Sequence, residues 1–458
     1  MKRWYYSRSF RQRTFFEARW LKASEMVRPV YIVLLLLLCE GCARRAAQEP
    51  VTLTLLGEWS SKAFTETRQL ELQQFTRETG TRVIFIPGPE SSWQRVLLWR
   101  ELLETGAKGP DVYDMDVIWP ATLSEYFLDL KPYFGSEISE QFPATTAAYT
   151  MDHKVVAMAY RADIGLLYYR NDLLQQYGYR GPPKTWDDLE SMAARIQAGE
   201  RAKGNKDFWG FVWQGAADEG LTCNALEWQA AEGGGRIIEE DQTISVNNPR
   251  VIRAWQRAAH WVGSISPPAI VGYRQWDSLN VWMAGNAAFM RHWTSAFVDS
   301  RVAGSQIRDK FDVTQLPGGE SGSVGTLGGW GLAVSRLSSH PTEAIKLVRY
   351  LTRKDAQVER ARTLSAPPTR PELYNLSGVS ESNARFQLLG QAFRSGIVVR
   401  PSNISGKKYR EVSEAYFQAV NSVLTRKVGA PQAAAALENE LVRITDFKKG
   451  PPMDPVHP

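Results

Sequence analysis

Carboxylates and tryptophans lie at the ends of the strand-like segments of this sequence, where side chains can meet a ligand. Asp116 and Asp163 each end or interrupt an apolar segment, so each carboxylate would need hydrogen-bonding partners if it were buried. Several tryptophans lie at similar positions, namely Trp119, Trp293 and Trp330. Aromatic rings match the apolar C–H face of a sugar, and charged groups that form paired hydrogen bonds match its hydroxyl rim. Together these residue types favour a carbohydrate-binding cleft.

Trp330 stands among four glycines in residues 325–335, GTLGGWGLAVS. Glycine lets the backbone turn sharply and lets another group come close. A tryptophan in a packed core would not need such clearance, and the segment lacks the spacing of a phosphate-binding loop. We therefore predict that Trp330 faces a ligand.

Other common chemistries have no specific signature in the sequence. There is no G-x-x-x-x-G-K-[ST] loop, no strand-linked G-x-G-x-x-G and no G-x-S-x-G elbow. The five histidines are far apart and Cys223 has no C-x-x-C near it, so we predict no metal site and no cofactor. Asp116 and Asp163 are of the type that a glycosidase uses as acid and base, and this alternative stays open.

The positive charge of the chain is concentrated at its start. Residues 1–41 hold eight Lys/Arg and three Asp/Glu, a net of +5, whereas the whole chain has a net of +6. The rest of the chain is therefore near +1. This balance predicts no nucleic-acid-binding surface.

The same first segment has the pattern of an export signal, which we assign to residues 1–41. Basic residues precede the apolar run at 30–38, which is much shorter than the roughly 20 residues that a membrane-spanning helix needs. Small Gly41 precedes Cys42, as at a cleavage site. The arrangement resembles a bacterial lipoprotein signal, which implies that Cys42 is acylated. Cleavage without lipidation and a buried hydrophobic hairpin are the alternatives, and Met26 is an alternative start.

Strand-like and helical segments alternate along the rest of the chain. The first strand patterns cover 51–56, 82–86 and 111–119. Helical patterns lie between them, the first ending near Gly80 and the second covering 91–105. Further along, Thr185 followed by Asp188 predicts the N-terminus of a helix. This alternation predicts sheets that are mainly parallel and covered by helices.

Seven blocks, taken in order, carry a family resemblance: FTRETGTRV, PDVYDMDVIWPATLSEYFLDL, DIGLLYYRNDLL, PPKTWDDL, FWGFVWQG, GNAAFMRHW and TLGGWGLAVS. They resemble family 1 extracellular solute-binding proteins of ABC importers, and most closely the trehalose/maltose-binding branch. The resemblance runs from about residue 50 to residue 445. It implies an α/β fold of the two-lobe, type II periplasmic-binding-protein kind, in which each lobe is a mainly parallel sheet flanked by helices. Such a protein closes on an oligosaccharide and delivers it to a membrane permease.

The resemblance also implies which residues contact the ligand. The set is Asp116, Asp163, Trp293, Trp330, Arg95, Arg370, Trp119 and Glu66. The aspartates correspond to acceptors for sugar hydroxyls, the tryptophans to stacking platforms, and the arginines to residues that reach the ligand in that branch. Glu58 is the alternative to Glu66 as the early acidic ligand. The branch often has Tyr two places before the second aspartate, where this chain has Arg161.

The resemblance further implies that the chain crosses between two lobes at hinge segments. Lobe 1 would comprise 50–160 and 331–384, lobe 2 would comprise 161–330 and 385–446, and 447–458 would form a tail. Trp330 would then lie at a hinge crossing on the floor of the cleft.

We therefore expect a non-enzymatic, substrate-binding lipoprotein that is exported to the periplasm or cell surface and anchored to the membrane. Its partners would be a di- or oligosaccharide of the trehalose or maltose kind and the permease and ATPase subunits of an ABC transporter, with the binding protein itself a monomer. Two alternatives remain at this level. One is a secreted carbohydrate-active hydrolase that uses Asp116 and Asp163, and the other is a sugar-sensing subunit of a signalling system.

Overall fold

The computed structural model describes residues 50–453 apart from 59–61, 90, 107–108, 377–378 and 380–383. The expected signal peptide at 1–41, the alternative start at Met26 and the lipidation site at Cys42 lie outside the described residues, as does the end of the expected tail. None of the described helices is both long enough and apolar enough to cross a membrane.

Six strands form the first sheet, in the order β13-β12-β3-β1-β2 with β6 paired to β12. Its N-terminal part consists of β1 (Thr52–Gly57), α2 (Lys62–Thr79), β2 (Arg82–Pro87), α3 (Ser92–Glu104) and β3 (Val112–Asp116). β1 pairs in parallel with both β2 and β3, as the alternation of strands and helices predicts. The carboxyl ends of parallel strands meet at one edge of a sheet, so Glu58 after β1 and Asp116 at the end of β3 lie at the same edge.

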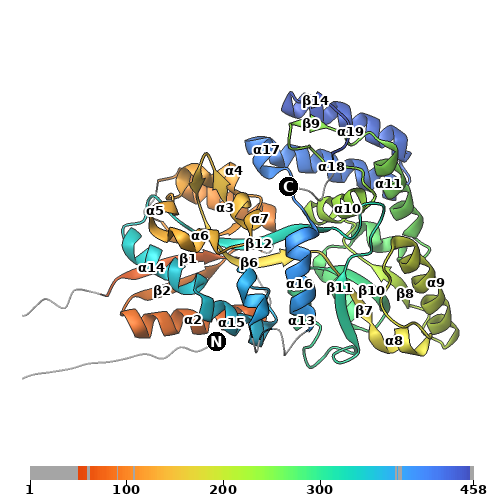
Figure 1. Cartoon of the computed structure of the whole chain (residues 1–458), viewed down its shortest axis with the longest axis horizontal. Helices are drawn as coiled ribbons and strands as arrows, with labels where there is room; N and C mark the ends of the chain where they lie inside the picture. The colour runs from red at the N-terminus through yellow and green to blue at the C-terminus, as the bar shows by residue number, and fades with distance from the viewer. Residues whose placement is uncertain are drawn as a thin grey trace, which may run out of the picture. The chain divides into compact units, whose positions relative to one another are not determined.

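Two strands continue the first sheet toward the second. β12 (Gly325–Val334) is ten residues long and lies between β3 and β6 (Met158–Ile164), antiparallel to both. Figure 1 shows β6 and β12 running next to each other between the two sheets. Only Gly165 separates β6 from β7 (Leu166–Arg170), which already belongs to the second sheet. The chain therefore changes sheets without an intervening loop.

The second sheet has the order β11-β7-β10-β8. Its other strands are β8 (Trp209–Val212), β10 (Ala287–His292) and β11 (Phe311–Gln315). β8 and β10 pair in parallel, whereas β7 is antiparallel to both of its neighbours. The parallel pairing that the sequence predicts is thus limited here to β8 and β10, which the helices between them connect as a parallel crossover requires.

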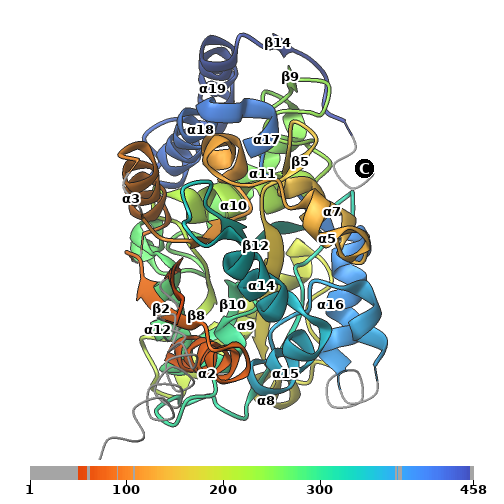
Figure 2. The same cartoon turned by 90° about the vertical axis from the view of Figure 1, so that its left-hand side faces the viewer.

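Helices cover both sheets. In sequence order they include α7 (Pro143–Ala148), α8 (Asn171–Gln176), α9 (Trp186–Ala202), α10 (Glu219–Ala231), α11 (Pro249–Trp261), α12 (Gln275–Met283), α14 (Pro341–Thr352), α15 (Lys354–Leu364), α16 (Ala384–Ser395), α18 (Tyr409–Leu424) and α19 (Ala430–Thr445), with the short elements α4 (Pro120–Leu123), α13 (Ala296–Asp299), β13 (Ile397–Val398) and α17 (Ser402–Ser405). Figure 2 shows α14 in front of β12. Leu347 and Val348 of α14 share an apolar core with Leu332 of β12, so this helix holds the crossing strand from one face.

The predicted helix start at Thr185 is confirmed. The Thr185 hydroxyl accepts a hydrogen bond from the backbone N–H of Asp188 at 3.1 Å, and the Asp188 carboxylate accepts one from the backbone N–H of Thr185 at 3.1 Å. Such reciprocal capping satisfies two N–H groups that a helix start would otherwise leave unpaired. It fixes where α9 begins beside the second sheet.

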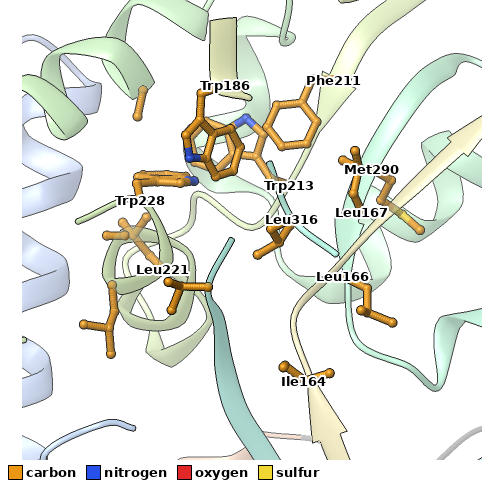
Figure 3. Packing of buried hydrophobic residues seen from close by; sticks show 14 of the residues in the cluster. Ile164, Leu166, Leu167, Trp186, Phe211, Trp213, Leu221, Trp228, Met290 and Leu316 are labelled. Carbon is orange, nitrogen blue, oxygen red and sulfur yellow. The ribbon is translucent and has the colours of Figure 1, made fainter. Parts of the chain in front are cut away.

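A cluster of tryptophans fills the core of the second sheet and its helices. Figure 3 shows Trp186, Trp213, Trp228 and Phe211 in one cluster. The Trp213 and Trp228 rings meet edge to face with centroids 5.0 Å apart, an arrangement that aromatic rings favour. Most of the tryptophans of this region are therefore packing residues and are not available to a ligand.

Candidate functional site

The pairing register of three strands places three side chains of candidate function in one row. Trp330 on β12 lies opposite Asp116 on β3 and opposite Arg161 on β6. Two residues earlier on β12, Gly328 lies opposite Asp163. Residues i and i+2 of a strand share a face, so Arg161 and Asp163 project from the same side of β6. The long strand β12 thus brings together residues from positions far apart in the sequence.

The glycines of β12 make room for Trp293, which follows β10. A Cβ atom on Gly328 would lie 3.0 Å from the Trp293 ring and 3.3 Å from the Cβ of Asp163. Gly329 has a φ of +132°, which favours glycine. The Arg291 guanidinium lies 4.3 Å from the centroid of the Trp293 ring. The clearance seen at Gly328 therefore serves the approach of Trp293, whereas the sequence attributed it to Trp330.

Trp330 is 8% exposed and is held by two neighbours. The Arg95 guanidinium lies 4.7 Å from its ring centroid, and the Trp119 ring meets it edge to face at 5.3 Å. Trp119 itself is almost fully buried. Trp119 is thus the more deeply buried of the two rings and packs against Trp330.

Asp163 is anchored through one of its two oxygens. Its Oδ1 accepts hydrogen bonds from the backbone N–H of Thr294 at 2.9 Å, the Thr294 hydroxyl at 2.7 Å and its own neighbour's backbone N–H, that of Ile164, at 3.0 Å. Burial raises the pKa of the Asp163 carboxyl, and the nearby Arg161 cation and these hydrogen bonds act in the opposite direction. The carboxylate is held in one orientation between the two sheets.

Asp116 faces a buried arginine that the sequence analysis did not identify. Arg400, which follows β13, has its Nη2 3.8 Å from Asp116 Oδ1 and its Nη1 2.8 Å from Glu219 Oε1 at the start of α10. Burial raises the pKa of Asp116, and the Arg400 cation lowers it. Arg400 also ends an apolar segment, in the sequence VVRP. A charged residue at the end of an apolar segment is the same feature that identified Asp116. Sequence reasoning could therefore have found Arg400.

Glu58 lies at the edge shared by β1 and β3. Its carboxylate pairs with Arg161 at 2.9 Å, and its backbone N–H donates to Asp114 Oδ2 at 2.7 Å. Asp114 in turn pairs with Arg68 of α2 at 3.1 Å. Burial raises the pKa of Glu58 to about 7, with the Arg161 cation opposing the rise. Glu58 therefore stands next to the row of Asp116, Trp330 and Arg161.

Two residues of the predicted ligand set lie apart from this group. The Glu66 side chain is 59% exposed on α2 and lies 3.7 Å from Lys62. Arg370 is buried and pairs with Glu140, with Glu137 nearby. We refer to the residues that the structure does bring together as the crossing-strand site: Glu58, Arg95, Asp116, Arg161, Asp163, Trp293, Trp330 and Arg400.

A separate cavity of about 260 Å³ adjoins Arg400. Apolar side chains of α7, of β12 and of residues 393–404 form most of its wall. Arg400 is the only residue of the crossing-strand site that lines it, and Phe393 is its only aromatic side chain among the described residues. Its polar residues include Arg236 and Glu240, which pair with each other at 2.8 Å, and Arg394, so the cavity combines an apolar wall with a charged part.

Comparison with known proteins places the chain in one family. Residues 59–358 match the family of bacterial extracellular solute-binding proteins. A probable ABC transporter-binding protein of Deinococcus radiodurans is 41% identical over 396 residues, which cover 86% of this chain and 94% of the relative.

Solved structures agree with this family. The maltose-bound MalE3 protein of T. maritima has a TM-score of 0.79 at 32% identity, covering 86% of this chain and all (100%) of the other. The GacH receptor of Streptomyces glaucescens, solved unliganded and with acarbose, has a TM-score of 0.75 at 22% identity and covers 87% of this chain and 100% of its own. The latter similarity concerns the fold alone. The two-lobe fold of periplasmic binding proteins is thus confirmed.

Proposed function

Because this chain belongs to the family of bacterial extracellular solute-binding proteins, we propose that it captures a di- or oligosaccharide at the crossing-strand site and delivers it to an ABC transporter. One observation supports this proposal most strongly: charged hydrogen-bonding groups and tryptophan rings lie together at the strands that join the two sheets. A sugar offers hydroxyls to the former and its C–H face to the latter. The maltose bound to the T. maritima relative supports the same ligand class.

Each residue type has a distinct role in this proposal. Asp116 and Asp163 accept hydrogen bonds from sugar hydroxyls, and Arg95 donates to sugar oxygens. Trp293 and Trp330 provide apolar surface, with Trp119 behind Trp330. Glu58 takes the part of the early acidic ligand in place of Glu66, because its carboxylate lies beside Arg161 while that of Glu66 faces solvent. We include Arg400 in the site because its guanidinium lies 3.8 Å from the Asp116 carboxylate.

The partners follow from the transporter role. The permease subunits and their ATPase would receive the sugar when the two lobes open. We propose that the protein is exported, acts as a monomer and is anchored by acylated Cys42, a residue outside the described part of the chain. Membrane fractionation of a Cys42→Ser variant tests the anchor, and unchanged membrane attachment would contradict it.

Binding without hydrolysis is the role that the family and the site support. Asp163 Oδ1 is occupied by three hydrogen bonds, and Asp116 faces the Arg400 cation. A general acid or base needs a proton that it can exchange with the substrate. Carboxylates held in this manner suit recognition of hydroxyl groups.

A thermal-shift screen with maltose, trehalose and mannitol tests the proposal. A ligand at 100 times its dissociation constant stabilises a protein by about 2.7 kcal/mol, so binding raises Tm measurably. We expect at least one of these sugars to raise Tm in the wild type and to fail in Trp330→Ala. Cys223→Ala, a change of a buried residue outside the site, is the control and should keep the ligand-induced shift. No shift with any sugar, together with a shift from an amino acid or peptide, would refute the assignment.

A further inference from the structure

Arg161 and Arg95 have more hydrogen-bonding capacity than the site uses. The Arg161 side chain is 7% exposed and spends one nitrogen on Glu58. Within the described residues, Nε and Nη1 of Arg161 and Nε and Nη1 of Arg95 are buried and have no hydrogen-bonding partner. A buried donor left unsatisfied costs about 1–3 kcal/mol, and a charged one costs more. These N–H groups therefore need acceptors that the described part of the chain does not supply.

Glu58 is the carboxylate that pairs with Arg161, and the Arg95 cation also lowers its pKa. The groups that act on its carboxyl come from four elements: Asp114 on β3, Arg68 on α2, Arg95 on α3 and Arg161 on β6. Arg68 already pairs with Asp114 at 3.1 Å, so these two charges largely cancel. The charge state of Glu58 therefore depends mainly on its burial and on Arg161. The Arg161 guanidinium also lies over the Phe64 ring, 4.8 Å from its centroid.

We propose that Arg161 is a specificity-determining residue: it holds Glu58 as the ionised acceptor for one ligand hydroxyl, while its free N–H groups and those of Arg95 donate to neighbouring hydroxyl oxygens. The ligand class that fits is a sugar or polyol with two adjacent hydroxyls at this corner. Each hydroxyl can donate to the carboxylate and accept from a guanidinium. A planar guanidinium matches such an oxygen-rich edge, whereas an aromatic side chain at this position would match a ring face. The proposal rests on the proposed function.

The arrangement makes ligand capture depend on pH. A ligand hydroxyl can donate to Glu58 only while the carboxyl group is ionised. The affinity for the ligand is therefore highest above the pKa of Glu58 and falls as the pH drops below that pKa. With this pKa at about 7, affinity should fall about tenfold between pH 8 and pH 6. Removal of the Arg161 cation raises the pKa further, so the loss then sets in at higher pH.

Isothermal titration of the full chain with maltose, trehalose and mannitol at pH 6, 7 and 8 tests the proposal. We expect the wild type to bind about tenfold more weakly at pH 6 than at pH 8. Glu58→Gln should bind weakly with the same affinity at every pH. Arg161→Gln should lose affinity already between pH 8 and pH 7, and it should change the ratio of affinities among the three probes.

Arg170→Gln is the matched control, because Arg170 is also a buried arginine paired with a carboxylate, Asp172 at 2.6 Å, and lies in the second sheet. It should keep the wild-type pH profile and the wild-type affinity ratios. A flat profile in the wild type, or an equal loss for all probes in Arg161→Gln, would overturn the role of Arg161 while the sugar-binding function stands. If none of the probes binds at any pH, the proposed function fails and this inference fails with it.

Discussion

Two buried arginine–glutamate pairs in this protein differ in how completely their hydrogen bonds are satisfied. In the second sheet, Arg291 donates to both oxygens of Glu227 and also to Gln214 at 3.2 Å, and Glu227 accepts the backbone N–H of Thr326 at 3.0 Å. In the crossing-strand site, Arg161 uses one nitrogen on Glu58 and leaves two without partners among the described residues. Burial is similar in both places.

We interpret the difference as that between a structural pair and the binding pair proposed above. A saturated network in a low-dielectric interior rigidifies the fold, whereas an unsaturated one carries an energetic cost that a ligand can remove. Buried charge by itself therefore identifies neither role. Unpaired donors have to be considered together with position, because Arg370, which lies apart from the site, also has two buried nitrogens without a hydrogen-bonding partner in the described part of the chain. Within the crossing-strand site, Arg95 and Arg161 have two each.

The largest effect should come from breaking the saturated pair. Glu227→Ala leaves the Arg291 cation buried without its partner, which should lower the free energy of unfolding by about 3–5 kcal/mol. Urea denaturation measures this loss. Glu58→Ala is the matched comparison, and it should lower stability less, because Arg161 uses one nitrogen on Glu58 whereas Arg291 donates to both oxygens of Glu227. Equal losses in both variants would remove the distinction.

Trp330→Ala should have the next largest effect, and on binding. A central aromatic contact typically contributes about 2 kcal/mol or more, so affinity for the sugar found in the thermal-shift screen should fall roughly 30-fold or more. Trp330→Phe should keep most of the affinity because it preserves an aromatic face. Calorimetric titration measures both. Undiminished affinity in the alanine variant, with a native melting curve, would remove Trp330 from the site.

Asp116→Ala and Asp163→Ala should each weaken sugar binding by about 10- to 150-fold, since a hydrogen bond to a charged group contributes roughly 1.5–3 kcal/mol. Asp163 also has a structural share, because Thr294 donates to it twice. Its variant should therefore lose more stability than that of Asp116, and thermal melts of the two variants side by side check the order. The opposite order would contradict the anchoring role of Asp163.

The smallest effect should come from a fully satisfied polar group outside the crossing-strand site. Thr185→Ala removes the N-cap of α9 and should lower stability by about 1 kcal/mol. Sugar affinity should stay at the wild-type value, as titration can verify. A change in sugar affinity would mean that α9 is coupled to the site. The comparison of the Arg291–Glu227 and Arg161–Glu58 pairs predicts no such coupling.

Much of the first sheet could be predicted from local patterns. The strands 51–56 and 82–86 appear as β1 and β2 with ends shifted by one residue, and Thr185 begins α9 as its spacing with Asp188 indicates. These features depend on contacts between near neighbours in the chain, which a sequence displays directly. The antiparallel pairing of β7 could not be seen, because its partners β10 and β11 come much later in the chain and local patterns do not show which strands become neighbours.

The candidate site was predicted in part. Asp116, Asp163 and Trp330 were found because each interrupts an apolar or glycine-rich strand, and the structure brings them together. Glu66 and Glu58 were indistinguishable in sequence, since both are acidic residues near the first strand. Their exposure in the folded chain separates them.

The sequence by itself determined the residue types, their order along the chain and the family to which the chain belongs. The tertiary structure decided which charged groups find hydrogen-bonding partners and which keep N–H groups without one. Arg400 reaches Asp116 from a position 284 residues further along the chain, and Arg161 reaches Glu58 across the sheet. Hydrogen-bond satisfaction is a property of three-dimensional neighbours at distances of about 3 Å, and no spacing in the sequence encodes it.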